Sequence, residues 1–269
     1  MRRSRRFLLP GVLGLLLAVF ASVGARGGDE GDELGRIRRL ESARAQLDSA
    51  RRHKLAFRRA VEEERGFLRT RAVEAYRAVR VYHPEEPATC AEAAFRAGEI
   101  LRAAGGFDEA LAEFAWARAR GVGPFRVRAQ LEIGHIQRRV GRPSEALDAY
   151  LAVVADANAS AGLRDEALLW AGRVRADEGR NDDARRMWER VAEAGEDPVD
   201  RIRAYDYLAL LWVVAGDPEA AAGVLDRCRR ALSDVALEET KRGERVRKAL
   251  VRMRVVKALQ RAVENRIGE

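Results

Sequence analysis

A pattern of two small residues and one large residue recurs four times in this sequence at nearly constant spacing. In each copy a small residue stands twelve positions before an alanine, and a large residue follows that alanine by four positions. The copies are Gly98, Ala110 and Phe114; Gly134, Ala146 and Tyr150; Gly172, Ala184 and Trp188; and Ala209, Ala221 and Leu225. The alanines lie 36, 38 and 37 residues apart, so each copy has room for two helices joined by a turn.

These offsets fit two antiparallel helices that approach each other closely. Close approach requires a small side chain on both helices, so we expect the first small residue to meet the alanine at the crossing. We expect the large residue to fill the groove against the neighbouring pair. A glycine stands five residues before each alanine and suits the left-handed conformation that ends many helices. The predicted helix pairs are 88–104/107–120, 125–140/143–156, 163–178/181–194 and 200–215/218–232.

The composition favours helices throughout the chain. There are 48 Ala but only three Thr and six Ile, and Ala is the best helix former whereas β-branched residues favour strands. The prolines after residue 80 fall between predicted pairs or in a first turn, where proline is tolerated. We therefore predict an all-α fold, a helix-turn-helix repeat solenoid with flanking N- and C-terminal helices.

The pattern resembles the tetratricopeptide repeat (TPR), which places small and aromatic residues at similar offsets with a period near 34 residues. The resemblance covers four repeats from Ala88 to Leu232, although the leading Trp of the TPR signature is absent. Its Tyr position is held by Leu101, Gln137, Arg175 and Trp212. A fifth, degenerate copy at Ala60, Ala72, Tyr76 and Pro84 extends the predicted repeat domain to residues 71–232. The resemblance implies a groove, lined by the first helix of each pair, that holds a protein or peptide.

Residues 1–25 have the layout of a secretory signal peptide. Four Arg lie among the first six residues, an apolar stretch runs from Phe7 to Val23, and small residues follow. We expect cleavage between Ala25 and Arg26, with an uncleaved inner-membrane anchor as the alternative. The general secretory and twin-arginine routes both remain open. Either way, the sequence predicts an exported protein of the periplasm or cell envelope.

Helical segments are also predicted on both sides of the repeats. In the 26–70 segment, apolar residues between Asp32 and Glu64 recur mostly every three, four or seven positions. This spacing predicts a long amphipathic helix or a short coiled coil, which would make the protein a homo-oligomer. The sequence of residues 233–269 predicts a basic capping helix. Its basic face is either simply solvated or binds an anionic lipid or an acidic partner. Its apolar stripe comprises Val246, Leu250, Met253, Val256, Leu259, Val263 and Ile267.

The sequence offers little for catalysis, metal binding or nucleic-acid binding. His53, His83 and His135 lie in different predicted helices, without a Glu or Cys at ligand spacing. Cys90 and Cys228 fall in the first and last repeats, too far apart for a disulfide. The net charge of +8 comes from the two ends, whereas a nucleic-acid binder normally carries a basic stripe on its main domain. We predict no catalytic residue, no metal, no cofactor and no nucleic-acid partner.

The predicted groove carries charged side chains on the first helices of the repeats. The partner-binding candidates are Arg102, His135, Arg139, Arg173 and Asp206. Because Arg102, Arg139 and Arg173 occupy comparable places in consecutive repeats, their guanidiniums could form a ladder that grips carboxylates. In the alternative, Glu99 or Glu132 simply neutralises them. The Lys and Asn carboxylate clamp known in the TPR family is not reproduced at these positions.

We therefore predict a non-catalytic adaptor or scaffold of the bacterial cell envelope that binds a partner in its groove. The bacterial origin rests on the signal peptide and on the use of Arg over Lys, 46 against 4, which is typical of high-GC coding. One alternative is an oligomeric structural or assembly factor that uses the N-terminal helix. Another is an accessory subunit of an envelope enzyme. If residues 1–25 are retained as an anchor, we expect the protein to lie near a membrane.

Overall fold

The computed structural model describes residues 37–120 and 122–255. The chain divides into two units, Met1–Arg38 and Arg39–Glu269, and all of the described helices belong to the second. The predicted signal peptide or anchor over residues 1–25 lies outside the described residues. Of the helices that are described, none is long and apolar enough to cross a membrane.

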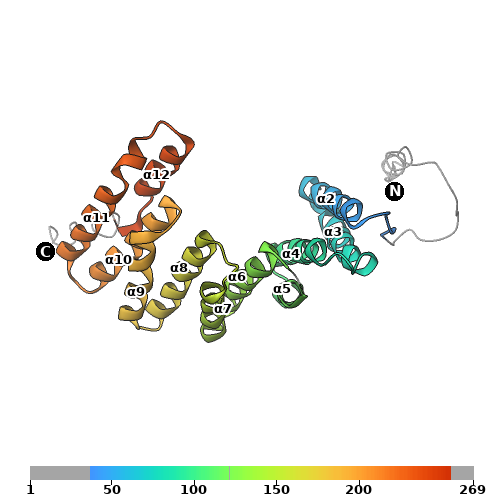
Figure 1. Ribbon diagram of the computed structural model, residues 1–269, viewed down its shortest axis with the longest axis horizontal. Helices are drawn as coiled ribbons and strands as arrows, with labels where there is room; N and C mark the ends of the chain where they lie inside the picture. Colours follow the sequence, from blue (N-terminus) through green and yellow to red (C-terminus); the bar gives the residue numbers. More distant parts are fainter. Residues whose placement is uncertain (1–36, 121, 256–269) are drawn as a thin grey trace, which may run out of the picture. The chain divides into compact units, whose positions relative to one another are not determined.

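Eleven helices and no strand make up the regular structure of the described residues (Figure 1). Each helix contacts the next along the chain, so the helices stack as consecutive pairs. The pairs are α2 (Ala43–Arg59) with α3 (Glu62–Tyr82), α4 (Pro87–Ala103) with α5 (Phe107–Arg120), α6 (Pro124–Arg139) with α7 (Pro143–Ala155), α8 (Ala161–Asp177) with α9 (Asn181–Ala194), and α10 (Pro198–Val214) with α11 (Pro218–Leu237). A final helix, α12 (Lys241–Val251), follows the last pair. The predicted all-α repeat solenoid is confirmed.

Local signals set the ends of these helices. From α4 to α10 every helix begins and ends within two residues of its predicted bounds, and only α11 differs more, because it continues to Leu237. Five of the helices carry proline in their first two positions, where the missing N–H costs no intrahelical bond. The turn glycines all have left-handed φ angles of 76° to 83°: Gly105, Gly141, Gly179 and Gly216.

The N-terminal segment is not one long helix, so the prediction of a continuous helix to Glu64 is wrong. Ala60 and Val61 are extended and separate α2 from α3. The charges explain the break, because α2 ends with Arg58 and Arg59 whereas α3 begins with three successive Glu. Basic residues stabilise the C-terminus of a helix, and acidic residues stabilise the N-terminus, through the helix dipole. The domain boundary that we expected between residues 70 and 71 falls inside α3.

The pair α2 and α3 stacks on the repeats as the degenerate fifth copy would. Ala72 and Tyr76 of α3 are buried, but Ala60 lies in the turn, where it cannot serve as the small residue of the first helix. In α2 the fully buried small residue is Ala50 instead. Ala43, Leu47 and Ala50 from the stripe that suggested a coiled coil are buried, and α2 packs against α3 and α4. Val61, at the end of the stripe, is exposed. The buried part of the stripe is therefore not free to form a coiled coil.

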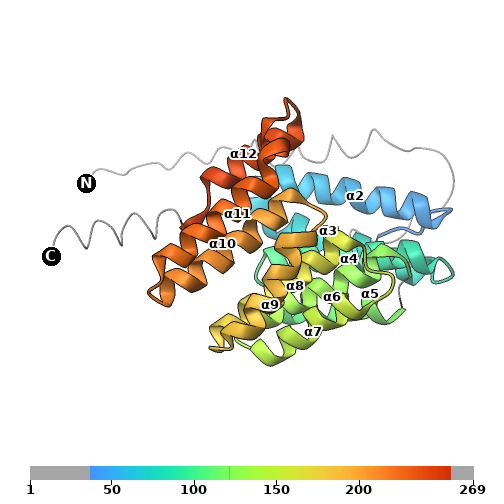
Figure 2. The same ribbon diagram turned by 60° about the vertical axis from the view of Figure 1, so that its left-hand side comes forward.

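The C-terminal segment also differs from the single capping helix predicted over 233–269. Residues 233–237 continue α11, and α12 is a separate helix whose N-terminus is capped by the Thr240 hydroxyl. Figure 2 shows α12 beside α10 and α11, both of which it contacts. From the predicted apolar stripe, Val246 and Met253 are buried and Leu250 is partly buried, whereas residues 256–269 lie outside the described part of the chain.

The small and large residues of the repeat signature meet inside each helix pair. In three copies the aromatic ring packs directly over the glycine twelve positions before the alanine. The contacts are Phe114 over Gly98, Tyr150 over Gly134 and Trp188 over Gly172. A Cβ added at Gly134 would lie only 2.6 Å from Cε1 of Tyr150. The large residue therefore packs first within its own pair, which our expectation did not include. In the third copy it also meets the neighbouring pair as expected, because the Trp188 ring lies 5.0 Å from that of Tyr207 in α10.

The remaining residues of the signature show why the pattern repeats. The second-helix alanines are all fully buried: Ala110, Ala146, Ala184 and Ala221. In the fourth copy Ala209 is fully buried but carries its own Cβ, so an aromatic ring cannot sit on its backbone. There the large residue is Leu225, which is only half-buried. In these four copies, glycine in the first helix is accompanied by an aromatic residue in the second helix, and alanine by Leu225.

Candidate functional site

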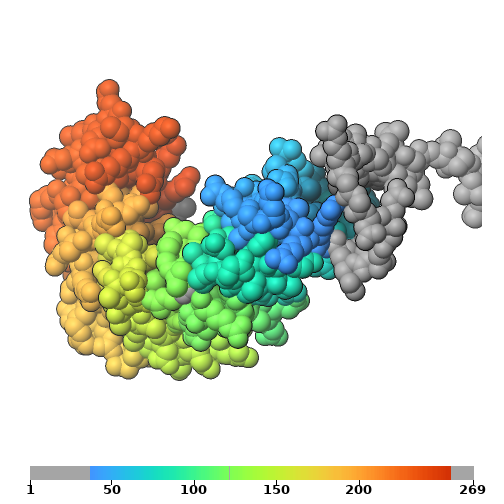
Figure 3. All heavy atoms as spheres, turned by 45° about the vertical axis from the view of Figure 1, so that its right-hand side comes forward, coloured from blue at the N-terminus to red at the C-terminus, as the bar shows by residue number. Residues whose placement is uncertain are grey.

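The first helices of successive pairs form one continuous face. α2 contacts α4, α4 contacts α6, α6 contacts α8 and α8 contacts α10, and these contacts are more extensive than those between successive second helices. A stack whose first helices lie closer together bends with those helices on its inner side. We call the surface of α2, α4, α6, α8 and α10 the inner face. Figure 3 shows the molecular surface hollowed between α2 (blue) and the α10–α12 end (orange to red).

A hollow of about 210 Å³ lies at the middle of the inner face, where α4, α6 and α8 meet. We call it the central hollow. Its lining consists of Arg102 from α4, four residues of α6 and Trp170 from α8, the α6 residues being His135, Ile136, Arg138 and Arg139. Three of the five predicted binding residues are therefore brought together: Arg102, His135 and Arg139.

The arginines of the central hollow are held by aromatic rings and by one ion pair. The Arg138 guanidinium lies 4.4 Å from the centre of the Trp170 ring, and that of Arg139 lies 5.4 Å from the Phe107 ring. Arg102 is paired with Glu132, with Nε 3.0 Å from Oε2. A guanidinium stacked on a ring keeps the N–H groups of its edge available, and these suit a carboxylate.

His135 links the central hollow to the packing of the repeat. Its Nδ1 lies 2.9 Å from the hydroxyl of Tyr150, the ring that packs on Gly134. Its Nε2 lies 3.7 Å from a carboxylate oxygen of Glu166, and this contact lowers the pKa of Glu166. Burial raises the pKa of Tyr150 to about 12, so its hydroxyl stays protonated. The repeat signature therefore fixes the position of the His135 ring.

The other two predicted binding residues lie elsewhere. Arg173 does not extend the row of guanidiniums, because it pairs with Asp177 on its own helix and faces the Tyr207 ring at 6.0 Å. Asp206 is 7% exposed and accepts a hydrogen bond of 2.9 Å from the backbone N–H of Val255. The predicted ladder of three arginines is therefore not formed, and Asp206 binds the backbone just after α12, away from the central hollow.

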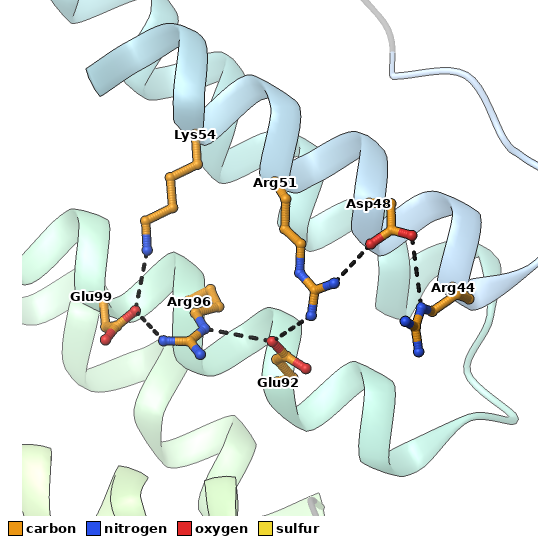
Figure 4. A network of polar contacts seen from close by, with 7 residues as sticks. All are labelled: Arg44, Asp48, Arg51, Lys54, Glu92, Arg96 and Glu99. Atoms are coloured by element: carbon orange, nitrogen blue, oxygen red, sulfur yellow. Dashed lines mark hydrogen bonds and ion pairs between the residues drawn. The ribbon is translucent and has the colours of Figure 1, made fainter. Parts of the chain in front are cut away.

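The α2 end of the inner face is occupied by an ion-pair network of seven side chains (Figure 4). Arg51 of α2 lies 2.7 Å from Asp48 on its own helix and 3.0 Å from Glu92 of α4. Lys54 and Arg96 share Glu99, at 3.3 and 3.0 Å. Glu99 is thus used here and not by Arg102. This network joins α2 to α4 and leaves little free charge at that end.

Sequence reasoning missed the aromatic supports of the central hollow, Trp170 and Phe107. One signal could have found Trp170, because it stands two positions before the small residue of its repeat. The same register position holds Arg96, Glu132 and Tyr207, and all of these lie on first helices. Phe107 follows a turn glycine and carries no comparable signal.

Metal-ligand clusters and cysteine thiols are two kinds of reactive group that would indicate an enzyme site among the described residues. Within residues 37–120 and 122–255 no group of three or more His, Cys, Asp and Glu could hold a metal ion. Cys90 and Cys228 are both buried and free. Burial raises the pKa of Cys228 to about 11, which keeps its thiol protonated and unreactive.

Solved structures with a similar fold include TPR-like repeat proteins. The crystal structure of the MamA protein is 18% identical, with a TM-score of 0.54 over 74% of this chain and 97% of that chain. A Podosopora anserina putative kinesin light chain with nearly identical TPR-like repeats is 18% identical, with a TM-score of 0.52 over 74% and 100%. BtubC from P. vanneervenii, also 18% identical, gives a TM-score of 0.52 over 74% and 91%. No family model and no curated protein matches the sequence. The chain therefore has the TPR-like fold.

Proposed function

We propose that this protein is a non-catalytic interaction scaffold that binds a protein partner on its inner face. The observation that carries the proposal is the central hollow, where Arg102, Arg138 and Arg139 converge beside His135. The TPR-like fold supports it, because solenoids of this kind present an extended inner surface to their partners.

The chemistry of the central hollow favours a carboxylate of the partner. Arg138 and Arg139 are stacked on rings and have no carboxylate partner among the described residues. A side-chain or C-terminal carboxylate can accept two parallel N–H bonds from one guanidinium. The volume of about 210 Å³ fits one side chain rather than a folded element. We therefore expect an extended peptide segment that inserts an Asp, a Glu or its C-terminus.

Variants of the inner face test this proposal. Arg102→Gln with Arg139→Gln removes two charges from the central hollow, and Arg190→Gln with Arg227→Gln removes two from exposed sites on the second helices α9 and α11. We expect the wild type and the Arg190/Arg227 control to capture the same partner proteins from envelope extract. The Arg102/Arg139 variant should capture at least tenfold less of them, a loss of about 1.4 kcal/mol or more in binding free energy. Equal capture by all three would overturn the proposal.

The cell envelope is the proposed location, on the strength of the sequence of residues 1–25. The intact mass of exported protein should correspond to a chain beginning at or near Arg26. A mass that retains residues 1–25 on membrane-bound protein would favour the anchor instead. Protein found only in the cytoplasm would overturn the proposed export.

A further inference from the structure

A second, larger hollow lies where α12 packs against α10. Its volume is about 460 Å³, roughly twice that of the central hollow. Five cationic side chains line it: one from α10, two from α12 and two from the residues after α12. They are Arg203, Arg245, Lys248, Arg252 and Arg254. The only acidic side chain in the lining is Asp206. We call this the basic hollow.

The acidic partners of these cations mostly stand outside the basic hollow. Arg203 pairs with Asp200 at 2.8 Å and Arg245 with Asp197 at 2.8 Å, but neither carboxylate belongs to the lining. Lys248 pairs with Glu244, which likewise lies outside it. The carboxylates that pair with these three cations are therefore not part of the lining.

The remaining cations leave positive charge in excess. Arg254 lies 3.8 Å from Asp206, but that carboxylate also accepts the Val255 N–H. Arg252 is exposed and has no ion-pair partner among the residues that the structure describes. The lining thus carries five cations and one acidic side chain already engaged by the fold. Such a surface attracts a ligand with several negative charges.

An aromatic ring joins the basic hollow to the inner face. Tyr207 lines the hollow, and its ring lies 5.4 Å from the Arg254 guanidinium and 6.0 Å from that of Arg173. Tyr207 also packs on the ring of Trp188, with 5.0 Å between centroids. The ring is therefore held from behind and supports the cations at the edge of the hollow, as Trp170 supports Arg138.

We propose that the basic hollow binds an acidic segment of a protein, one with several successive Asp or Glu side chains. Its position at the end of the inner face suits an extended chain, and its volume holds several side chains. An anionic bilayer is usually met by an amphipathic helix that lies flat, with apolar residues beside its cations. Here the cations surround a concavity, which favours a peptide. The site is separate from the central hollow and does not depend on it.

A charge-matched pair of variants tests the basic hollow. Lys248→Gln with Arg252→Gln removes two exposed cations from the lining, neither of which pairs with α10. Arg227→Gln with Arg230→Gln removes two exposed cations from α11, outside the lining. The probe is fluorescent hexa-aspartate, whose binding to the full chain is measured by anisotropy. We expect about five- to tenfold weaker binding with the first pair and little change with the second.

Other outcomes would overturn the inference in distinguishable ways. Equal weakening by both pairs would show that net charge alone attracts the probe, and no weakening by the first pair would show that the hollow is not the site. Binding of phosphatidylglycerol vesicles without binding of hexa-aspartate would indicate a lipid ligand instead. The central-hollow variant, Arg102→Gln with Arg139→Gln, should weaken hexa-aspartate binding less than the basic-hollow pair does, and the opposite order would place the probe in the central hollow and overturn the inference. Failure of the proposed function would therefore not be mistaken for failure of this site.

Discussion

The contact of Tyr150 with Gly134 makes a quantitative prediction for Gly134→Ala. The added Cβ would lie 2.6 Å from Cε1, 2.8 Å from Cδ1 and 3.1 Å from Cζ of the ring, all inside the usual contact distance of about 3.5–4.0 Å. The ring cannot move away easily, because Tyr150 is fully buried and its hydroxyl is bonded to His135. Overpacking of this kind costs about 1–3 kcal/mol.

Helix propensity acts in the opposite direction and offsets part of this cost in the free energy of unfolding. Ala in place of Gly inside a helix stabilises by about 0.5–1 kcal/mol. For Gly134→Ala we therefore expect a net loss of about 0–2.5 kcal/mol in the free energy of unfolding. Gly223→Ala in α11 is the matched control, because nothing lies within 4 Å of its Cβ position. That variant should gain about 0.5–1 kcal/mol.

The fourth repeat suggests how to rescue the variant. There the chain itself combines Ala209 with Leu225, so Gly134→Ala with Tyr150→Leu reproduces a natural combination. In a double-mutant cycle followed by urea denaturation and circular dichroism, Gly134→Ala should be neutral or stabilising in the Tyr150→Leu background. If Gly134→Ala stabilised the wild type as much as Gly223→Ala does, the ring contact would not be what requires glycine at position 134.

Three further predictions concern packing and titration. Ala146→Leu should lower the free energy of unfolding by about 1–3 kcal/mol, because Ala146 is fully buried; an unchanged melting temperature would argue against the assigned crossing. In an NMR titration the Glu166 carboxyl should titrate below 4.5 because of His135, and the Glu132 carboxyl above 4.5 because of burial. The stabilisation from Glu166 is present above pH 4.5 and is lost as the pH falls through its folded-state pKa. Glu132 acts in the opposite sense: it favours the folded state below pH 4.5 and loses that effect as the pH rises. A titration midpoint for Glu132 below that for Glu166 would contradict the geometry. Cys228 should resist a thiol reagent at pH 8 until the protein unfolds, because burial raises its pKa to about 11, and rapid labelling of native protein would refute this.

The helix pairs could be predicted because their signals are local. Turn glycines, first-turn prolines and the small–large offsets act within about forty residues, and they placed most helix ends within two residues. The break between α2 and α3 was missed because apolar spacing continues across it. Only the charges, Arg58 and Arg59 before it and the three Glu after it, distinguish two helices from one.

The candidate site was predicted only in part, because it depends on contacts between repeats. Register placed Arg102, His135 and Arg139 on first helices, and these meet in the central hollow. It could not show that Arg173 turns toward Asp177, or that Asp206 binds the backbone after α12. These two contacts depend on side-chain rotamers and on the path of the chain after α12. The periodicity of the sequence gives no information on either.

The central claim is that partners bind the inner face, and site-specific photo-crosslinking tests it most directly. A photoreactive amino acid at Arg128, an exposed residue of α6 seven residues before His135, would report on the inner face without removing a residue of the central hollow. One at Arg190, also exposed but on the second helix α9, would report on the opposite side of a repeat. In intact cells we predict a crosslinked partner protein from position 128 that is absent from position 190 and is lost when Arg102→Gln and Arg139→Gln are added. The same crosslink from both positions, or one from position 190 alone, would contradict binding at the inner face.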